Sequence, residues 1–188
     1  MRKIVLVTGG SGEIGSAISR KFADNGYDVI ISYNSNSKRA TEFIATLPYG
    51  NHAVFHAPTT DASKVKAFAQ FVTDNYGKID VLVNNAGITI PVAHDNLDGL
   101  SDEWIDKIMQ TNFRGSFAMV RAFKDLLEKS TEESALIVNI SSIAGIFGVG
   151  SNVAYCASKA ALDSMTRSLA RALAPKIRVL SVSPGFVE

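Results

Sequence analysis

Hydrophobic and polar positions follow two different periods along this chain, and segments with one period alternate with segments with the other from end to end. Short runs rich in β-branched apolar residues predict strands. These runs are Ile4–Val7, Val29–Ser32, Ala53–Ala57, Val81–Val83, Leu136–Ile140 and Arg178–Val182. The stretches between them carry apolar residues three and four positions apart, which predicts amphipathic helices. One such helix face is Ile14, Ala17, Ile18 and Phe22. The expected order is therefore strand and helix in strict alternation.

Residues that favour helix ends stand between these segments. Gly26 and Gly77 follow predicted helices, where a glycine commonly closes the last turn in a left-handed conformation. Asp61 and Ser101 precede predicted helices and can cap them. Pro48 is expected to close the second helix. These boundaries support the alternation.

Parallel strands that are joined by helical crossovers form a doubly wound sheet with helices on both faces. We expect an α/β fold of this Rossmann-like kind, with three αβα layers and the strand order 3-2-1-4-5-6. Residues 1–188 are expected to form a single dinucleotide-binding and catalytic domain. Ligands bind such sheets beyond the carboxyl ends of the strands, so the residues that follow each strand are candidates for a site.

Composition removes several classes of function. With 188 residues, 46% of them hydrophobic, and a net charge of +1, the chain is too apolar and too balanced in charge to be disordered. It has no basic block for nucleic acid or anionic lipid, and no apolar run near the ~18 residues of a membrane span. The single cysteine, Cys156, excludes an internal disulfide and fits a reducing compartment. We therefore expect a cytoplasmic protein whose partner is a small molecule, with no nucleic acid and no membrane.

A glycine-rich turn follows the first predicted strand and opens the first helix. Its sequence is Thr8-Gly9-Gly10-Ser11-Gly12-Glu13-Ile14-Gly15, in which Gly10, Gly12 and Gly15 have the spacing G-x-G-x-x-G. Glycines at this place allow a tight turn, a close approach of a pyrophosphate to the backbone, and close packing of helix on strand. The alternative is a turn without a ligand. The position in a βαβ unit favours dinucleotide binding, with contacts expected from Gly9, Ser11, Gly12, Ile14 and Gly15.

A second polar turn, Asn84-Asn85-Ala86-Gly87, closes the fourth predicted strand, which flanks the first strand in the expected order. Asparagines there can bind backbone across the crevice, and Gly87 lets a cofactor pass close to the chain. The alternative is an Asx turn that only ends the strand. We expect Asn85, Ala86 and Gly87 to contact the cofactor.

Tyr155 and Lys159 lie four residues apart and share a face if their segment is a helix. A phenol is a poor acid–base catalyst at neutral pH, and an adjacent cation favours the phenolate. Ser142 ends the fifth predicted strand, so its hydroxyl is expected at the same edge of the sheet as the glycine turn. These three side chains are candidates for a catalytic group.

The two glycine-containing turns, Ser142 with Tyr155 and Lys159, and Ser183-Pro184-Gly185 together resemble the short-chain dehydrogenase/reductase family. The resemblance covers essentially the whole chain and is strongest for the NADP-dependent carbonyl reductases that include 3-oxoacyl-carrier-protein reductases. It implies an oxidoreductase that transfers a hydride between NADP(H) and a carbonyl or secondary alcohol, with 3-oxoacyl thioesters among the candidate substrates. It also implies a homo-oligomer, a tetramer or a dimer, that packs through its long helices.

The resemblance assigns a role to individual residues. It implies that Tyr155 is the general acid/base and that Ser142 holds the substrate oxygen. It implies that Lys159 tunes Tyr155 and holds the nicotinamide ribose, and that Asn112 anchors a proton-relay water. Val187 is expected to contact the cofactor. Taken singly, Ser142 could instead form a turn and Asn112 could kink a helix.

Three departures from the family pattern bear on this assignment. The common reductase turn has a glycine where this chain has Glu13, and the spacing here is that of epimerase-type members. We expect Glu13 to point outward, because its carboxylate would repel a pyrophosphate and suits a helix N-terminus. Pro58 stands where the family usually has an aspartate that contacts adenine, so adenine recognition is expected to use backbone or Thr59. The family continues past Gly185, so the 188 residues are expected to lack a substrate-covering segment and a seventh strand.

The stretch after the second strand bears on the choice between NADP and NAD. NAD-selective sites place an acid there, which binds the ribose 2′-hydroxyl and repels a 2′-phosphate. No acid appears in the segment 29–41. We expect NADP(H) to be preferred, with hydrogen bonds from Asn34 and Ser35 and charge from Lys38 or Arg39. The alternative is a polar loop whose cations are solvated, with NAD as the cofactor.

Two rival functions stay open. The glycine spacing suggests an epimerase or dehydratase that uses the same machinery. Glu13, Pro58 and the missing cover suggest a dinucleotide-sensing protein without turnover. His52 and His56 are four residues apart but lie on a predicted turn and strand rather than on a helix, and His94 has no partner at metal-ligand spacing, so we expect no metal site.

Overall fold

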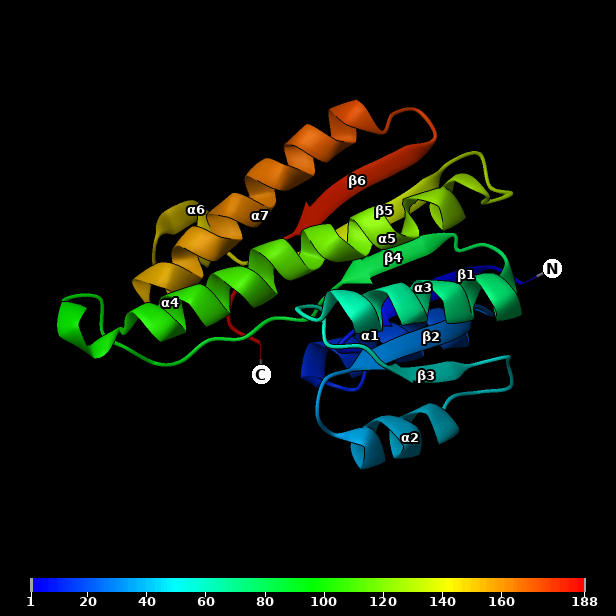
Figure 1. The fold of residues 1–188 in the computed structure, drawn as a ribbon, viewed down its shortest axis with the longest axis horizontal. Coiled ribbons are helices and arrows are strands. Elements are labelled where there is room, and N and C mark those ends of the chain that lie inside the picture. Colours follow the sequence, from blue (N-terminus) through cyan, green and yellow to red (C-terminus); the bar gives the residue numbers. More distant parts are fainter. Residues whose placement is uncertain (1, 188) are drawn as a thin grey trace.

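Six parallel strands form one sheet in the computed structural model, which describes residues 2–187 (Figure 1). They are β1 (Ile4–Thr8), β2 (Asp28–Tyr33), β3 (Ala53–His56), β4 (Val81–Asn84), β5 (Ala135–Ile140) and β6 (Ile177–Val182). Their order in the sheet is β3-β2-β1-β4-β5-β6, with parallel pairing throughout. The predicted strand order is confirmed, and each predicted strand differs from the observed one by at most one residue at either end.

Helices connect the strands, and two of the connections carry more than one. The helices are α1 (Glu13–Asp24), α2 (Ser37–Ala45), α3 (Ala62–Tyr76), α4 (Asp102–Met109), α5 (Ser116–Glu128), α6 (Ala144–Phe147) and α7 (Val153–Ala172). A π-helical segment, η2 (Gln110–Gly115), joins α4 to α5 without a break, and a 3₁₀ turn, η1 (Leu97–Gly99), precedes α4. The expectation of one helix per crossover was therefore wrong after β4 and after β5.

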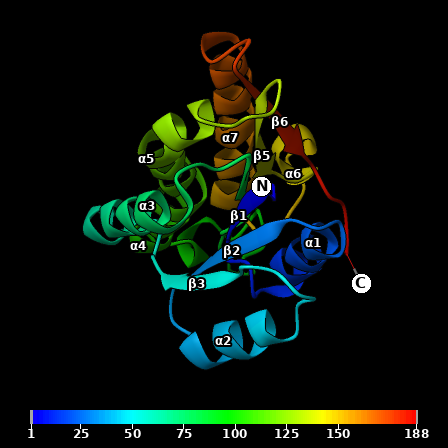
Figure 2. The ribbon, with the colours of Figure 1, turned by 90° about the vertical axis from the view of Figure 1, so that its right-hand side faces the viewer.

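The two faces of the sheet carry separate hydrophobic cores. Leu6, Ile30 and Ile137 belong to the core that α3, α5 and α7 cover. Val7 and Ile31 lie one residue along their strands and belong to the opposite core, under α1 and α2. Successive strand residues point to opposite faces, so both faces of a central strand must be apolar. Figure 2 shows α3 and α5 on one side of the sheet and α1 on the other.

The helix ends agree in part with the expected caps. Gly26 and Gly77 adopt left-handed φ angles of 81° and 73°. The Asp61 side chain accepts hydrogen bonds from the first turn of α3, which confirms it as a cap. Ser101 occupies the N-cap position of α4 but makes no side-chain cap bond. The second helix ends at Ala45, before Pro48, so the proline does not itself close it.

None of the helices within residues 2–187 combines the length and the hydropathy that a bilayer-spanning segment needs. The cytoplasmic location expected from the sequence stays a prediction.

Candidate active site

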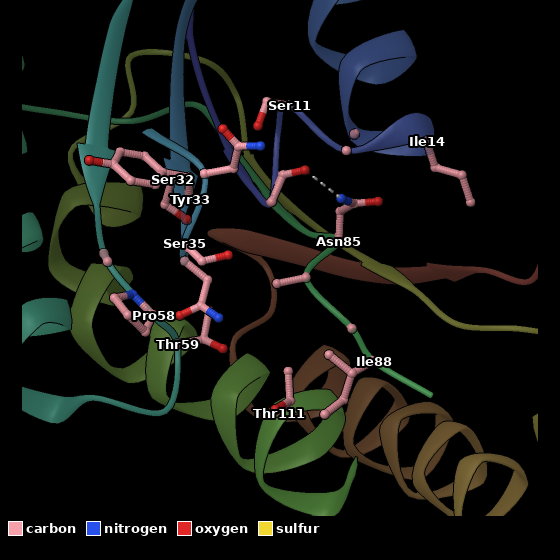
Figure 3. A pocket seen from close by; sticks show the side chains of 18 of the residues that line it. Ser11, Ile14, Ser32, Tyr33, Ser35, Pro58, Thr59, Asn85, Ile88 and Thr111 are labelled. Carbon is pink, nitrogen blue, oxygen red and sulfur yellow. Dashed lines mark hydrogen bonds between the residues drawn. The ribbon is translucent and has the colours of Figure 1, made fainter. Parts of the chain in front are cut away.

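A cavity of about 510 Å³ lies at the carboxyl ends of β1, β2, β3 and β4, where the fold class places ligands (Figure 3). In Figure 3 the side chains of Tyr33, Ser35 and Pro58 lie on one side of the hollow, and those of Asn85 and Ile88 lie on the other. Its volume is in the usual range for a small-molecule site, roughly 300–1,000 Å³.

The glycine turn after β1 forms one wall of the cavity. At two of its positions neighbouring atoms lie so close that only glycine fits. A Cβ atom on Gly10 would lie 2.4 Å from a side-chain carbon of Ile31 in β2. A Cβ on Gly15 would lie 2.3 Å from the carbonyl oxygen of Gly9 and 2.7 Å from Nδ2 of Asn85. The turn can therefore pack this tightly against β2 and the end of β4 only without side chains.

The N-terminus of α1 faces the same cavity. Gly12 is the N-cap residue and makes no side-chain cap bond, so backbone N–H groups of the first turn are left for an anion. Glu13 is exposed, yet it also borders the cavity. Glu13 is thus exposed, as expected for an outward side chain, and it still borders the cavity.

Hydrogen bonds lock the ends of β1 and β4 together beneath the cavity. Oγ1 of Thr8 accepts from the backbone N–H groups of Asn85 and Ala86, both at 2.9 Å. Nδ2 of Asn85 donates to the carbonyl oxygens of Thr8 and Gly9 at 3.0 and 3.2 Å. Asn85 therefore does more than end a strand: it holds the glycine turn and the polar turn in one relative position.

The end of β2 supplies hydroxyl, amide and cationic groups to the cavity. Asn34, Ser35 and Arg39 line it. Lys38 is not part of the lining, and its Nζ lies 3.8 Å from Oε1 of Glu42 on the exposed face of α2. Among the described residues that line the cavity, Glu13 is the one carboxylate. Of the two expected cations, Arg39 is thus the one that reaches the site.

Pro58 and Thr59 follow β3 and line the same cavity. Thr59 is buried, and a Cβ on Gly115 would lie 2.5 Å from its Oγ1, so Thr59 packs closely against η2. A hydroxyl and a proline ring therefore stand where the family pattern has an acid.

Lys159 is buried in α7, with a relative exposure of 5%. Its Nζ donates to the carbonyl oxygen of Ile140, the last residue of β5, at 2.7 Å, and lies 5.6 Å from the ring centre of Tyr155. Burial lowers the pKa of Lys159 to about 8, and the charge of Asp163 opposes part of that shift. The spacing of four residues thus brings the ammonium group next to the phenol, as the sequence predicted.

Ser142 follows β5 and begins the turn that leads into α6. Its Oγ accepts a hydrogen bond from the N–H group of Ala144 at 3.1 Å. Gly145 lies so close to α7 that a Cβ there would be 2.8 Å from the backbone of Lys159. Ser142 therefore forms the turn that leads to Gly145, and Gly145 packs against α7; the catalytic role of Ser142 stays a prediction.

Asn112 lies in the π-helical segment η2, with 1% of its surface exposed. Its Oδ1 accepts from Ile88 N–H at 2.8 Å, and its Nδ2 donates to the Ile88 carbonyl and to Oγ of Ser158, both at 3.0 Å. Its side chain thus joins three elements: η2, the turn after β4, and α7.

The cavity brings together most of the expected cofactor contacts. Those that line it are Gly9, Ser11, Gly12, Ile14, Gly15, Asn34, Ser35, Asn85, Ala86 and Gly87. The other expected cofactor contacts, Tyr155, Lys159 and the 64% exposed Val187, lie outside the lining, so their contact with the cofactor stays a prediction. No group of three or more His, Cys, Asp or Glu side chains in residues 2–187 is arranged to hold a metal ion.

Sequence reasoning missed Thr8 and Asn152. Thr8 joins the two turns, and its signal was a polar residue at the end of an apolar strand. Asn152 caps α7 through the N–H group of Tyr155 at 2.7 Å. Asparagine is a preferred N-cap residue and Asn152 directly precedes the predicted helix of Tyr155, so this contact could have been predicted.

Comparisons with known proteins point to one family. The family model for short chain dehydrogenases matches residues 3–188. A 3-oxoacyl-[acyl-carrier-protein] reductase FabG of Staphylococcus aureus is 36% identical over 192 residues, which cover 100% of this chain and 75% of the relative. The FabG of Thermotoga maritima is 36% identical over 189 residues, which cover 99% of this chain and 74% of the relative.

Solved structures agree. A crystal structure assigned to the short-chain dehydrogenases/reductases, from Burkholderia xenovorans, superposes with a TM-score of 0.95 at 34% identity and covers 100% of this chain and 78% of its own. NAD⁺-bound xylitol dehydrogenase superposes with a TM-score of 0.89 at 29% identity, covering 98% of this chain and 70% of its own.

Proposed function

Because the chain belongs to the short-chain dehydrogenase family and is an NAD(P)-dependent oxidoreductase, we propose that it transfers a hydride between NADP(H) and a carbonyl or secondary alcohol. One observation carries the proposal. Gly87 lines the cavity, and a Cβ on it would lie 3.3 Å from Oδ1 of Asn112 and 3.7 Å from Nζ of Lys159. This wall of the cavity thus lies next to Lys159, whose Nζ is 5.6 Å from the ring centre of Tyr155.

The residues of the cavity fit a dinucleotide. The bare backbone of Gly9, Gly12 and Gly15 and the open N-terminus of α1 suit a pyrophosphate. Lys159, next to Gly87, suits the hydroxyls of the nicotinamide ribose. The cofactor supplies or accepts the hydride when it is bound.

The side chains around Gly87 handle the proton and the oxygen. Ser142 already accepts a hydrogen bond from Ala144, so its own O–H proton is free to bind the substrate oxygen. Tyr155 gives its phenolic proton to that oxygen in the reduction and takes it back in the oxidation. The ammonium group of Lys159 stabilises the phenolate that forms. The Asn112 backbone, in the π-helical segment, is our candidate for anchoring the relay water.

Removing the phenolic hydroxyl tests this function. Tyr155→Phe should bind NADPH normally, while turnover falls ~10²–10⁴-fold, because that range is the usual contribution of a general acid. The measurement is NADPH oxidation against a panel of simple ketones, 3-oxoacyl thioesters and polyol-derived ketoses. Tyr49→Phe, at a side chain that is 91% exposed, is the matched control. Near wild-type turnover in Tyr155→Phe would remove Tyr155 as the acid.

We propose NADP(H) rather than NAD(H) as the preferred cofactor. Arg39, Asn34 and Ser35 offer a cation and hydrogen-bond donors at the end of β2, and none of the described lining residues that follow β2 is a carboxylate. Arg39→Ala should weaken NADPH binding by about tenfold or more and leave NADH binding nearly unchanged, since only NADPH carries the phosphate. Lys38→Ala is the control, because Lys38 lies outside the lining. Tighter binding of NADH by the wild type would contradict this preference.

A second candidate activity follows from Glu13. Its place in the turn gives the glycine spacing of epimerase-type members, and it borders the cavity. An epimerase would invert a hydroxyl-bearing centre with no net consumption of NADPH, so chiral analysis of the products separates the two activities. Membership of an enzyme family argues against the dinucleotide-sensing protein that the sequence left open.

We also propose a homo-oligomer, a dimer or a tetramer. Phe117 on α5 is 42% exposed and Ile105 on α4 is 36% exposed. Large apolar side chains on exposed helices favour burial against another copy. Light scattering coupled to size-exclusion chromatography measures the mass, and Phe117→Lys should shift it toward the monomer.

A further inference from the structure

A buried asparagine precedes the helix that carries Tyr155. Asn152 is 1% exposed and is the N-cap residue of α7. Its Oδ1 accepts a hydrogen bond from the N–H group of Tyr155 at 2.7 Å. An N-cap bond of this kind holds the first turn of a helix in place, and Tyr155 is the third residue of α7. One end of the Asn152 amide therefore sets the backbone from which the phenol projects.

The other end of the same amide binds the loop that follows β4. Nδ2 of Asn152 donates to the carbonyl oxygen of Ile90 at 2.7 Å and to Oγ1 of Thr89 at 3.1 Å. Both polar atoms of the buried side chain are thereby used: Oδ1 binds the helix that carries Tyr155, and Nδ2 binds the loop.

Further contacts run alongside this pair of bonds. The hydroxyl groups of Thr89 and Ser151 are hydrogen-bonded, and the N–H group of Val92 donates to the Ser151 carbonyl at 2.8 Å. Nε2 of His94 lies 3.1 Å from the carbonyl oxygen of Gly150. Segments 89–94 and 150–152 thus lie side by side, with Asn152 as the buried side chain between them.

The position of this loop matters because of where it starts. Ile88 lines the cofactor cavity and is held by Asn112 through both its N–H and its carbonyl group. The next two residues, Thr89 and Ile90, are held by Asn152. The loop therefore leaves the cavity beside Gly87 and passes directly to the start of the helix that carries Tyr155.

From this geometry we infer that Asn152 is a positioning residue that fixes the substrate-side loop 88–94 relative to the phenol of Tyr155. The inference rests on the proposed function, because it takes Tyr155 to be the acid. The cap sets the backbone of Tyr155 and therefore the rate of proton transfer. The bonds to Thr89 and Ile90 set the loop and therefore the binding of the carbonyl substrate.

Two substitutions separate the cap from the loop contacts. Asn152→Ser keeps an oxygen that caps α7 about as well as asparagine but has no amide to reach Ile90 and Thr89. Asn152→Ala removes both. Asn152→Ser should raise KM for the ketone about tenfold, which is the effect of one buried hydrogen bond. It should change kcat less than about threefold, because the serine still caps α7. Asn152→Ala should also lower kcat, by up to about tenfold, because the lost N-cap loosens the first turn of α7, which carries Tyr155.

The dissociation constant of NADPH should stay within about twofold in both variants, because Thr8, Asn85 and Asn112 still hold the cofactor side. Thr89→Val removes the hydroxyl that binds Asn152 and Ser151 but leaves the cap and the bond from Asn152 to Ile90, so it should also raise KM, by a smaller factor. Asn96→Ser is the matched control, since Asn96 is an exposed cap of η1 that binds Gly99.

Hydrogen exchange gives a readout that does not depend on the role of Tyr155. Asn152→Ser should speed exchange in peptides covering 88–94 but not in those covering 153–157, whereas Asn152→Ala should speed both. Wild-type exchange in 88–94 for Asn152→Ser and Thr89→Val, or equal losses of kcat in Asn152→Ser and Asn152→Ala, would overturn the inference. An active Tyr155→Phe variant together with the expected exchange pattern would instead show that the proposed acid, and not the contact, was wrong.

Discussion

Replacing Gly15 by alanine tests whether the glycine turn is built for close backbone approach. The added Cβ would lie 2.3 Å from the Gly9 carbonyl oxygen, 2.7 Å from Nδ2 of Asn85 and 3.0 Å from Cα of Gly10. Two of these atoms belong to the backbone, so they cannot move aside as the end of a flexible side chain would. The turn must open, and Asn85 must give up its bonds to Thr8 and Gly9.

The size of the effect follows from these contacts. Overpacking costs ~1–3 kcal/mol, and two lost hydrogen bonds cost about 1 kcal/mol each. The better helix propensity of alanine offsets ~0.5–1 kcal/mol of this, because Gly15 lies inside α1. The net loss in the free energy of unfolding is about 2–4 kcal/mol. For a protein of this size that lowers Tm by roughly 4–16 °C.

Gly12→Ala is the matched control in the same turn. Gly12 has a φ of −71°, and its added Cβ would come no closer than 3.2 Å to the Gly9 carbonyl oxygen. Its unfolding free energy should stay within about 1 kcal/mol of the wild type, while NADPH affinity falls about tenfold because the methyl group enters the pyrophosphate end of the cavity. Urea unfolding followed by circular dichroism, without cofactor, gives the first quantity and fluorescence titration the second. A Gly15→Ala protein as stable as Gly12→Ala would refute the reasoning.

Two further predictions concern charge. Burial lowers the pKa of Lys159 to about 8, so the ammonium form is present below that pH, and kcat/KM for NADPH-dependent reduction should fall as the pH rises through about 8; a flat alkaline profile would count against it. Burial alone would raise the pKa of Asp80, but hydrogen bonds from Lys78 and Ser130 lower it, so Asp80 stabilises the fold at neutral pH and loses that effect as the pH falls through its lowered pKa. Asp80→Asn should cost ~3–5 kcal/mol in urea unfolding because it leaves Lys78 buried without its counter-charge, whereas Asp125→Asn, at a side chain 90% exposed, should cost almost nothing.

The sheet and the main features of the site were predictable because they depend on local pattern. The apolar runs have the length of strands and both faces of the central strands are buried, so the pattern predicts a parallel doubly wound sheet, and the Rossmann-like class supplied the strand order. The glycine turn and the polar turn each follow a strand, and parallel strands all end at the same edge of a sheet. Tyr155 and Lys159 are neighbours because any helix brings residues four apart to one face.

Tertiary structure decided which polar groups meet. Sequence left Lys38 and Arg39 equivalent, and only the packing of α2 placed Arg39 in the cavity and Lys38 outside it. Sequence predicted only that Glu13 points outward, and the tertiary structure leaves this exposed side chain at the border of the cavity.

The contact between Asn152 and Thr89 shows why the sequence does not reveal such contacts. These residues lie 63 positions apart, so their hydrogen bond exists only because two crossovers bring the loop after β4 beside the start of α7. A residue's propensity depends on its neighbours along the chain, and this determines helices, strands and turns. The partners of a buried side chain depend on how the finished elements pack, and no local pattern contains that information.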